Sequence, residues 1–318
     1  MFWQSFQVTL LAVTQLFILG AIGYILVRKN ILGADGLKTL SRLVIEVIFP
    51  ALVFTQLARK FSFTLYPDWW MFPLIGVAIM LLGLIIGWPF SYFINGKKQK
   101  EQFLSLVAFQ NSGYLPLGLI ASILAGAGRD TMLIYLFLLL LGFDLVMWSF
   151  GVYLLTHEHA KKFALGSIFS PPVIASILGL LFVAFGLNKA IPEVAMKPLE
   201  MIGGCTLPLA LFVVGGNIAA FRPEHINKKA MSLMVLAKLI ILPGLGLLFL
   251  PHLKLPQLMG LMILMQLAMP PATSSSIIIR HYHREDFLIS QGIFLGHIIS
   301  LITIPLFLSL YFARVMIQ

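Results

Sequence analysis

Ten long, predominantly apolar runs follow one another along this chain of 318 residues, and no other feature constrains its fold as strongly. A helix needs about 20 such residues to cross the hydrocarbon core of a bilayer. We therefore predict an all-α polytopic membrane protein with ten transmembrane helices. The predicted spans cover residues 5–27, 37–58, 70–94, 102–125, 131–155, 168–187, 199–220, 230–250, 257–279 and 287–312.

The composition agrees with this prediction. Hydrophobic residues make up 59% of the chain and charged residues 11%, whereas about a quarter of the residues in a soluble domain are charged. The net charge of +10 comes from cations scattered in small groups between the apolar runs. Fourteen of the 22 Lys and Arg residues fall in the odd-numbered connections, and seven fall in the even-numbered ones or the C-terminal tail. The positive-inside rule then predicts both termini on the outer side of a cell membrane, most simply a bacterial inner membrane.

Other functional classes find no support in the sequence. There is no HExxH, GxSxG, P-loop or GxGxxG pattern, which argues against an enzyme or a nucleotide-driven pump. The single cysteine, Cys205, excludes a disulfide framework and a cysteine-based metal site. We expect no cofactor, no bound metal and no nucleic-acid partner, and we expect lipid around the helices.

Four landmarks recur in the same order in the two halves of the chain, at separations of 154 to 158 residues. The matching pairs are Pro50 and Pro208, Pro116 and Pro270, Asp130 and Asp286, and Gly142 and Gly296. Five spans per half would place the halves in opposite membrane orientations. We therefore predict an inverted repeat, with residues 1–156 as the first unit and residues 163–318 as the second.

The fourth and ninth spans are interrupted at corresponding places, by FQNSGYLPLG (109–118) and QLAMPPATSSS (266–276). Proline cannot continue a helix, and backbone groups freed within a membrane must face protein or a wet cavity. Interrupted segments in inverted halves indicate the binding site of a secondary transporter, and half-helix N-termini suit an anion. The candidate binding residues are Gln110, Asn111, Ser112, Gly113, Pro116, Pro270, Pro271, Thr273, Ser274 and Ser275.

Five segments together resemble the auxin efflux carrier family, which includes plant PIN and PIN-like exporters and bacterial malonate and malate permeases. The segments are RLVIEVIFPALVFTQLA (42–58), FQNSGYLPLGLIASI (109–123), LPLALFVVGGNIA (207–219), LAKLIILP (236–243) and LAMPPATSSSIII (267–279). The resemblance implies a scaffold of spans one, two, six and seven, and a transport domain of spans three to five and eight to ten. It also implies two crossing broken helices, elevator-type transport of organic anions, and homodimers formed through the scaffold helices.

The same resemblance assigns roles to a few residues. Asn111 and Pro116 match the Asn and Pro of the first crossover of the family, and Pro270 and Pro271 match the paired prolines of the second. The second crossover here, PPATSSS, lacks the Asn of several plant members. This departure shifts the polar contacts to hydroxyl groups and gives no support to a plant-hormone substrate.

Four residues that can carry a charge, Glu46, Asp144, Lys238 and His297, lie deep within the predicted spans, where a charge is costly and needs compensation. Asp144 and Lys238 would form a charge pair, which either titrates during transport or is static. Glu46 either lines the substrate cleft or pairs with Arg42 one turn away, and we favour the pair. His297 is either a proton carrier or a hydrogen-bonded structural residue, and we favour the structural role.

These patterns predict a secondary active or facilitative transporter of mono- or dicarboxylates that works by alternating access, with coupling to H⁺ or Na⁺ left open. The alternative is a sodium-coupled organic anion symporter of the bile-acid type. Neither crossover motif contains an acidic residue, which counts against the alternative. A membrane enzyme or receptor would need a catalytic constellation that the sequence does not contain.

Overall fold

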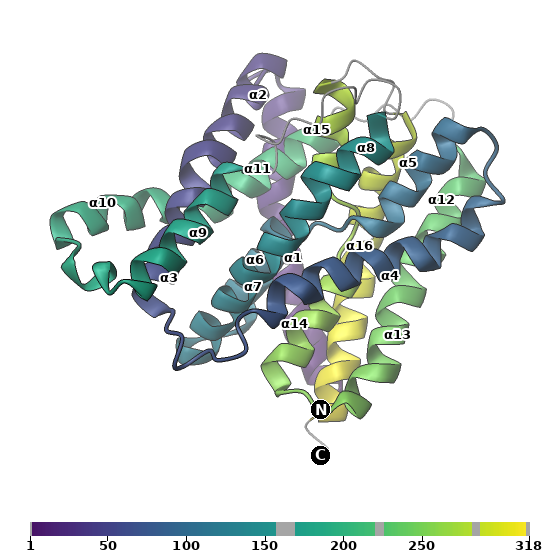
Figure 1. The fold of residues 1–318 in the computed structure, drawn as a ribbon. Helices are drawn as coiled ribbons and strands as arrows, with labels where there is room; N and C mark the ends of the chain where they lie inside the picture. The colour runs from purple at the N-terminus through teal and green to yellow at the C-terminus, as the bar shows by residue number, and fades with distance from the viewer. Residues whose placement is uncertain (1, 157–168, 220–225, 282–286, 316–318) are drawn as a thin grey trace.

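The computed structural model describes residues 2–156, 169–219, 226–281 and 287–315, and within these ranges it consists of helices joined by short connections (Figure 1). No β-strand occurs in this part of the chain, only one isolated β-bridge. The α-helices are α1 (Phe2–Arg28), α2 (Ala34–Leu43), α3 (Phe49–Lys60), α4 (Met71–Ser91), α5 (Lys97–Ala108), α6 (Tyr114–Ile123), α7 (Gly126–Val146), α8 (Val152–Thr156), α9 (Pro171–Ala184), α10 (Glu193–Gly204), α11 (Thr206–Ala219), α12 (Lys228–Met234), α13 (Leu242–Phe249), α14 (Gln257–Ala268), α15 (Ser274–His281) and α16 (Phe287–Val315).

Three of the long helices contain a π-helical turn, and two short 3₁₀ turns lie in connections. The π turns are η1 (Val44–Ile48), η2 (Met147–Gly151) and η5 (Val235–Ile241), and the 3₁₀ turns are η4 (Leu187–Ala190) and η6 (Leu250–Leu253). A π turn adds a residue to the helical path and commonly marks a functional site. The three π turns join α2 to α3, α7 to α8 and α12 to α13 into continuous helices.

Seven helices of the described chain, rather than ten, are long and apolar enough to cross a membrane. They correspond to predicted spans one, two, three, five, seven, eight and ten. In place of the other three there are shorter apolar helices, which are α6, α9 and α14. The fourth and ninth spans are divided by linkers, so neither half reaches spanning length. The sixth is short because α9 starts only at Pro171, where the rigid ring fits the first helical turn.

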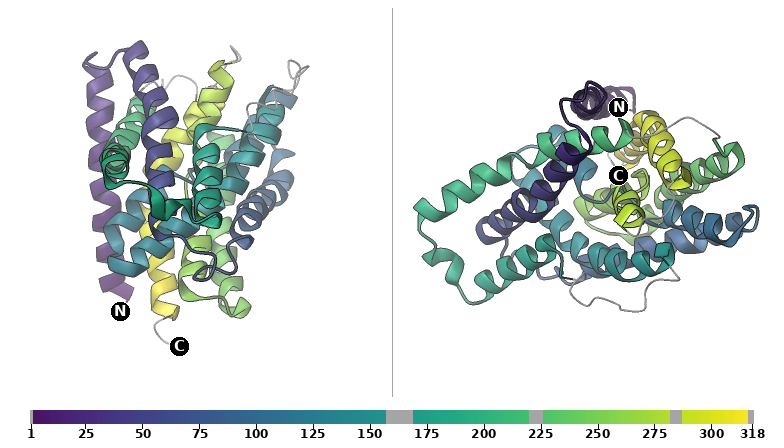
Figure 2. Two further views of the ribbon diagram at one scale, coloured as in Figure 1. Left: turned by 60° about the vertical axis from the view of Figure 1, so that its left-hand side comes forward. Right: turned by 90° about the horizontal axis from the view of Figure 1, so that it is seen from above.

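The helices pack in two groups. In one, which we call the scaffold group, α1 lies against α11, α3 lies against α9 and α10, and α2 touches α11. In the other, the crossing group, α4 packs on α5 and α7, and α14 packs on α13 and α16. The groups meet where α1 touches α6 and α16, and where α7 touches α3 and α9. Figure 1 shows α3, α9 and α10 at one edge of the molecule, and Figure 2 shows that α1 starts at the same end as α16 finishes. An even number of crossings would produce this arrangement of the ends.

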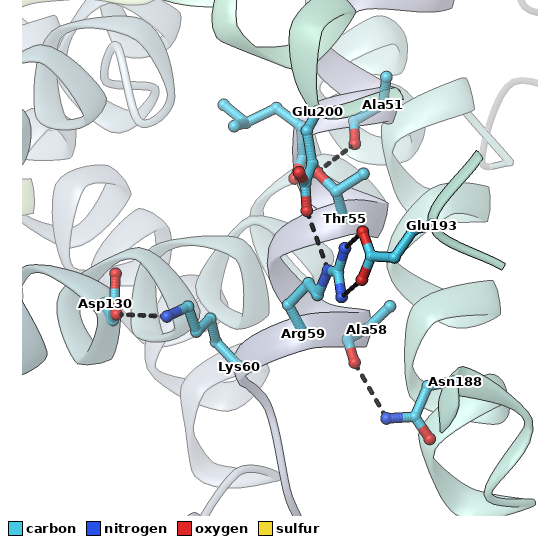
Figure 3. A network of polar contacts seen from close by, with 10 residues as sticks. Ala51, Thr55, Ala58, Arg59, Lys60, Asp130, Asn188, Glu193 and Glu200 are labelled. Atoms are coloured by element: carbon cyan, nitrogen blue, oxygen red, sulfur yellow. Dashed lines mark hydrogen bonds and ion pairs between the residues drawn. The ribbon is translucent and has the colours of Figure 1, made fainter. Parts of the chain in front are cut away.

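A polar network at the C-terminal end of α3 fixes the edge of the scaffold group (Figure 3). The Arg59 guanidinium donates two hydrogen bonds of 2.7 Å to Glu193 and one of 2.9 Å to Glu200, both from α10. The neighbouring Lys60 Nζ lies 3.1 Å from Asp130 Oδ2 at the start of α7. Arg59 therefore joins elements of the scaffold group to each other, whereas Lys60 joins the scaffold group to the crossing group.

Candidate functional site

The two interruptions predicted from the sequence are present as extended linkers that cross each other. Residues 109–113 connect α5 to α6, and residues 269–273 connect α14 to α15. Gln110 and Pro271 form an antiparallel β-bridge where the linkers meet. Segments far apart in sequence thus supply the hydrogen bonds that neither broken helix can supply for itself, as a buried backbone requires.

The hydrogen bonds of the crossing are arranged with approximate two-fold symmetry. Asn111 N donates to Pro270 O at 2.8 Å, and Ala272 N donates to Phe109 O at 3.0 Å. Each linker therefore contributes one donor and one acceptor, and the pairs are offset by the same number of residues. This backbone correspondence matches Phe109 with Pro270, whereas the sequence landmarks had matched Pro116 with Pro270.

The structure corrects the role of Pro116. This proline is the third residue of α6, which begins at Tyr114, and the break comes before it. Proline is tolerated in the first turn of a helix because the N–H it lacks would have no intrahelical acceptor there. The second linker does follow the prediction, since Pro270 and Pro271 stand within it and end α14.

A cleft opens beside the crossing and contains most of the predicted binding residues. This first cleft has an empty volume of about 610 Å³, part of it open to solvent, and it is also lined by α3, α7, η2 and the start of α9. Six predicted residues line it, which are Gln110, Asn111, Ser112, Gly113, Thr273 and Ser274. Ser275 does not line it, because its Oγ lies 3.3 Å from Ser105 Oγ in the buried interior. Pro270 and Pro271 form the crossing without lining the cleft.

Several buried polar atoms around the first cleft have no hydrogen-bond partner in the described chain. Gln110 is 0% exposed, and neither its Oε1 nor its Nε2 is hydrogen-bonded. The hydroxyls of Ser112 and Ser170 and the Oε1 of Gln266 are also buried without a hydrogen-bond partner. Leaving such a group unsatisfied costs about 1 to 3 kcal/mol. Buried polar groups are rarely left this way without a reason, and a ligand that is bound only part of the time is one such reason.

Two of these residues, Gln266 and Ser170, are not among the binding residues predicted from the sequence. Gln266, in α14, donates from Nε2 to Ser112 O at 3.0 Å and so holds the first linker against the second broken helix. Ser170 lines the first cleft from the position before Pro171, where a serine usually caps the helix, yet its side chain makes no cap hydrogen bond. A serine followed by two prolines at the start of an apolar helix was the available signal.

Asn111 is held by His297 of α16. Asn111 Nδ2 lies 3.3 Å from His297 Nε2, and His297 Nδ1 lies 2.7 Å from Ile293 O. A carbonyl oxygen only accepts, so Nδ1 donates to it, and Nε2 of the neutral ring accepts from the amide of Asn111. The hydrogen-bonded role expected for His297 is therefore confirmed, and the ring orients a residue of the first cleft.

A second cleft lies on the other side of this contact. It is lined by α1, α6, α11 and α16, it has an empty volume of about 990 Å³, and its walls are mainly apolar. His297 lines the second cleft, whereas Asn111 lines the first. The hydrogen bond between these two side chains is thus part of the wall that separates the clefts.

Two of the ionisable residues within the spans lie in π turns, Glu46 in η1 and Lys238 in η5, and Asp144 lies in α7 shortly before η2. No ion pair joins Asp144 and Lys238 in the described chain, so the predicted charge pair does not form. Asp144 lines the first cleft from α7, whereas Lys238 is 1% exposed in η5, among α4, α5, α14 and α16. Glu46 accepts from Arg42 Nε at 2.7 Å, which confirms the favoured pairing, and it does not line the cleft.

Comparison with known proteins identifies the family. The family model described as "Membrane transport protein", that of the auxin efflux carriers, matches residues 8–164 and 154–308. The chain belongs to the auxin efflux carrier family. It is accordingly a multi-span membrane transporter.

Relatives from an archaeon and a plant cover most of the chain. An uncharacterized transporter of Methanothermobacter thermautotrophicus is 26% identical over 92% of this chain and 95% of its own length. PIN-LIKES 7 of Arabidopsis thaliana is 23% identical over 86% of this chain and 89% of its own length. PIN-LIKES 1 of the same plant is 22% identical over 82% of this chain and 69% of its own length. The crossing and the residues that line the first cleft lie within the part of the chain that the family model matches.

Proposed function

We propose that this auxin efflux carrier family member moves small organic anions, mono- or dicarboxylates, across the membrane, and that the carboxylate binds at the crossing. One observation carries the proposal. The half-helices α6 and α15 both begin at the crossing, beside the unpartnered polar groups of Gln110 and Ser112 in the first cleft. The first N–H groups of a helix lack intrahelical acceptors and carry partial positive charge, which attracts a carboxylate.

The polar side chains of the first cleft complement this field. The Gln110 amide supplies donors and an acceptor, and Ser112 and Ser170 each supply a hydroxyl that has no partner in the described chain. No Lys or Arg is among the described residues that line the first cleft. Neutral donors and helix ends would therefore bind the anion, as half-helix N-termini do in secondary transporters.

Alternating access would follow from the positions of the two clefts. In the ten-span division, the first cleft uses spans two, five and six, and the second uses their repeat equivalents, spans seven, ten and one. The contact of α1 with α11 and that of α9 with α3 are equivalent in the same way. In our proposal the crossing group carries the substrate past the scaffold group, so that the site faces first one cleft and then the other.

Uptake into proteoliposomes tests this function. Asn111→Ala removes a cleft-lining amide, and Pro271→Ala loosens the second linker, and we expect each to slow carboxylate uptake at least tenfold while the purified protein stays folded. For Asn111→Ala the factor follows from about 1.5 to 3 kcal/mol for a hydrogen bond to a charged group. Asn217→Ala is the matched control, because Asn217 in α11 lines neither cleft. Wild-type rates in both well-folded variants would disprove the site.

The substrate class and the coupling ion can be examined separately. A thermal-shift screen against mono- and dicarboxylates should raise the melting temperature for the class that binds, because a ligand stabilises the state it binds. Replacing sodium by potassium in the uptake buffer should leave the rate unchanged. A rate that depends on sodium would instead favour the sodium-coupled alternative.

A further inference from the structure

Asp144 is an acidic residue in the wall of the first cleft without a compensating partner. Its carboxylate makes no hydrogen bond or ion pair within the described chain. A smaller cavity on its other side is lined mainly by apolar side chains, and three of them, Phe49, Leu140 and Pro172, also line the first cleft. An ionised carboxylate is expensive in such surroundings, so this side chain requires either a proton or a cation.

The helices packed against α7 offer no cation at this level. The described helices α4, α9 and α14 contain no titratable residue on any face. α6 contributes the phenol of Tyr114, which lines the same cleft. Arg59 of α3 pairs with Glu193 and Glu200 of α10, and Lys60 of α3 pairs with Asp130 near the start of α7. Glu46 of η1 is paired with Arg42. Tyr153 of α8 follows η2 and does not line the cleft.

A bound carboxylate substrate would raise the free-energy cost of keeping Asp144 ionised. A carboxylate bound at the crossing and the carboxylate of Asp144 would occupy one small cleft. Two negative charges at short range repel each other strongly where the dielectric constant is low. A single proton relieves this conflict. The crossing helices α6 and α14 both pack on α7, so Asp144 belongs to the same group of helices as the anion site.

We propose that Asp144 takes up a proton from the water of the open cleft when the carboxylate binds, and that both are carried together and released on the other side. This inference rests on the proposed function and assigns its coupling ion. An O–H bond forms on Asp144 on one side of the membrane and is broken by water on the other, with no other change in bonding. The transport of a monocarboxylate is then electroneutral, and a dicarboxylate is disfavoured because its second charge would lie near Asp144.

Proteoliposomes holding the full-length protein test the coupling, with labelled lactate, gluconate and malonate as probes and protein-free liposomes as the background. With acid outside, the wild type should accumulate a monocarboxylate about tenfold per pH unit of gradient, the limit for one proton per anion. A potassium diffusion potential set with valinomycin should not change that accumulation. Malonate should be taken up more slowly than either monocarboxylate.

Three variants sharpen the test. Asp144→Asn imitates the protonated acid, so it should still equilibrate the probe but no longer accumulate it under a pH gradient. Asp144→Glu keeps an acid and should keep the coupling, which guards against a mere folding defect. Glu46→Gln is the matched control, since Glu46 is an acid that lies outside the cleft, and it should accumulate the probe like the wild type.

The outcomes are distinguishable. Accumulation by Asp144→Asn equal to that of the wild type, or wild-type uptake that ignores the pH gradient, would overturn this inference and leave the proposed function standing. Uptake of alanine in preference to lactate, lost in Asp144→Asn, would also overturn it, because the carboxylate would then pair with a substrate ammonium. No uptake of any probe above background would overturn the proposed function itself.

Discussion

The two linkers of the crossing share a backbone arrangement but differ in chemistry. Each gives one N–H and one C=O to the other, with nearly equal distances. The first linker, 109–113, contains an amide, a second amide and a hydroxyl in succession, whereas the second, 269–273, contains two prolines and an alanine before its threonine. The two linkers therefore share a backbone pairing but differ in side chains, since the first contains polar groups and the second contains two rigid prolines.

The neighbours of the linkers differ in the same sense. The first linker is held by polar contacts, from Gln266 to Ser112 O and from Asn111 to His297. The second is held by close packing, because a Cβ on Gly296 of α16 would lie only 2.5 Å from Pro271 Cδ. Polar contacts can reorganise when a ligand arrives, whereas a packed proline ring is confined to one position. The difference suits a site in which the first linker can bind a ligand and the second linker holds a fixed position.

The largest effect should come from Gln110→Leu. This change removes two unpartnered polar atoms of the first linker at nearly constant volume. Uptake should fall roughly 100-fold, as expected for the loss of hydrogen bonds to a carboxylate at about 1.5 to 3 kcal/mol each. The melting temperature should stay the same or rise, because a buried unsatisfied group is gone.

A matched change at Gln266 separates ligand binding from support. Gln266→Leu removes a donor that is already used by Ser112 O, so it should lower the melting temperature as well as the uptake. If both Leu variants lowered stability equally, the distinction between ligand group and supporting group would fail. Differential scanning fluorimetry beside the uptake assay is sufficient for this comparison.

Gly296→Ala should come next, since it acts on the packing of the second linker. The new methyl group would press on a proline ring that has no room to move, and overpacking of this kind costs about 1 to 3 kcal/mol. Gly244→Ala in α13 is the control, because nothing lies within 4 Å of the added atom. We expect a lower melting temperature and slower uptake for the first variant and neither for the second. Equal melting temperatures would show that the linker is not tightly braced.

Pro270→Ala should have a smaller effect than Gly296→Ala but a larger one than Pro116→Ala. Pro270 stiffens the linker in both the folded and unfolded chain, so its loss should cost about 0.4 to 1 kcal/mol and slow uptake a few-fold. Pro116 stands in the first turn of α6, where alanine fits equally well, and its replacement should change little. Thermal melts of the two variants decide the matter, and a greater loss from Pro116→Ala would reverse the assignment of the rigid element.

The sequence was sufficient to predict the two interruptions but not their exact positions or their surroundings. Polar residues and paired prolines rarely stand inside an apolar run of a membrane protein unless the helix opens there, and i, i+4 spacing alone decided the pair of Arg42 and Glu46. The hydropathy pattern predicts how deep in the membrane a residue lies, but not the direction in which its side chain points. Asp144 and Lys238 therefore looked like partners, although they project into different parts of the protein.

The smallest effect concerns a contact between the two helix groups rather than within the crossing. The ion pair of Lys60 with Asp130 is half exposed at the lysine and joins α3 to α7, so it should contribute no more than about 1 kcal/mol. If the crossing group moves past the scaffold group during transport, this pair must break, and Lys60→Ala should then change the uptake rate less than fivefold. Asp130→Ala should do the same, and the double variant should add nothing, because both single changes remove one interaction. Raising the ionic strength should shrink the difference from the wild type, since screening weakens an exposed pair. Additive effects of the two changes would mean that the pair does not act across the boundary.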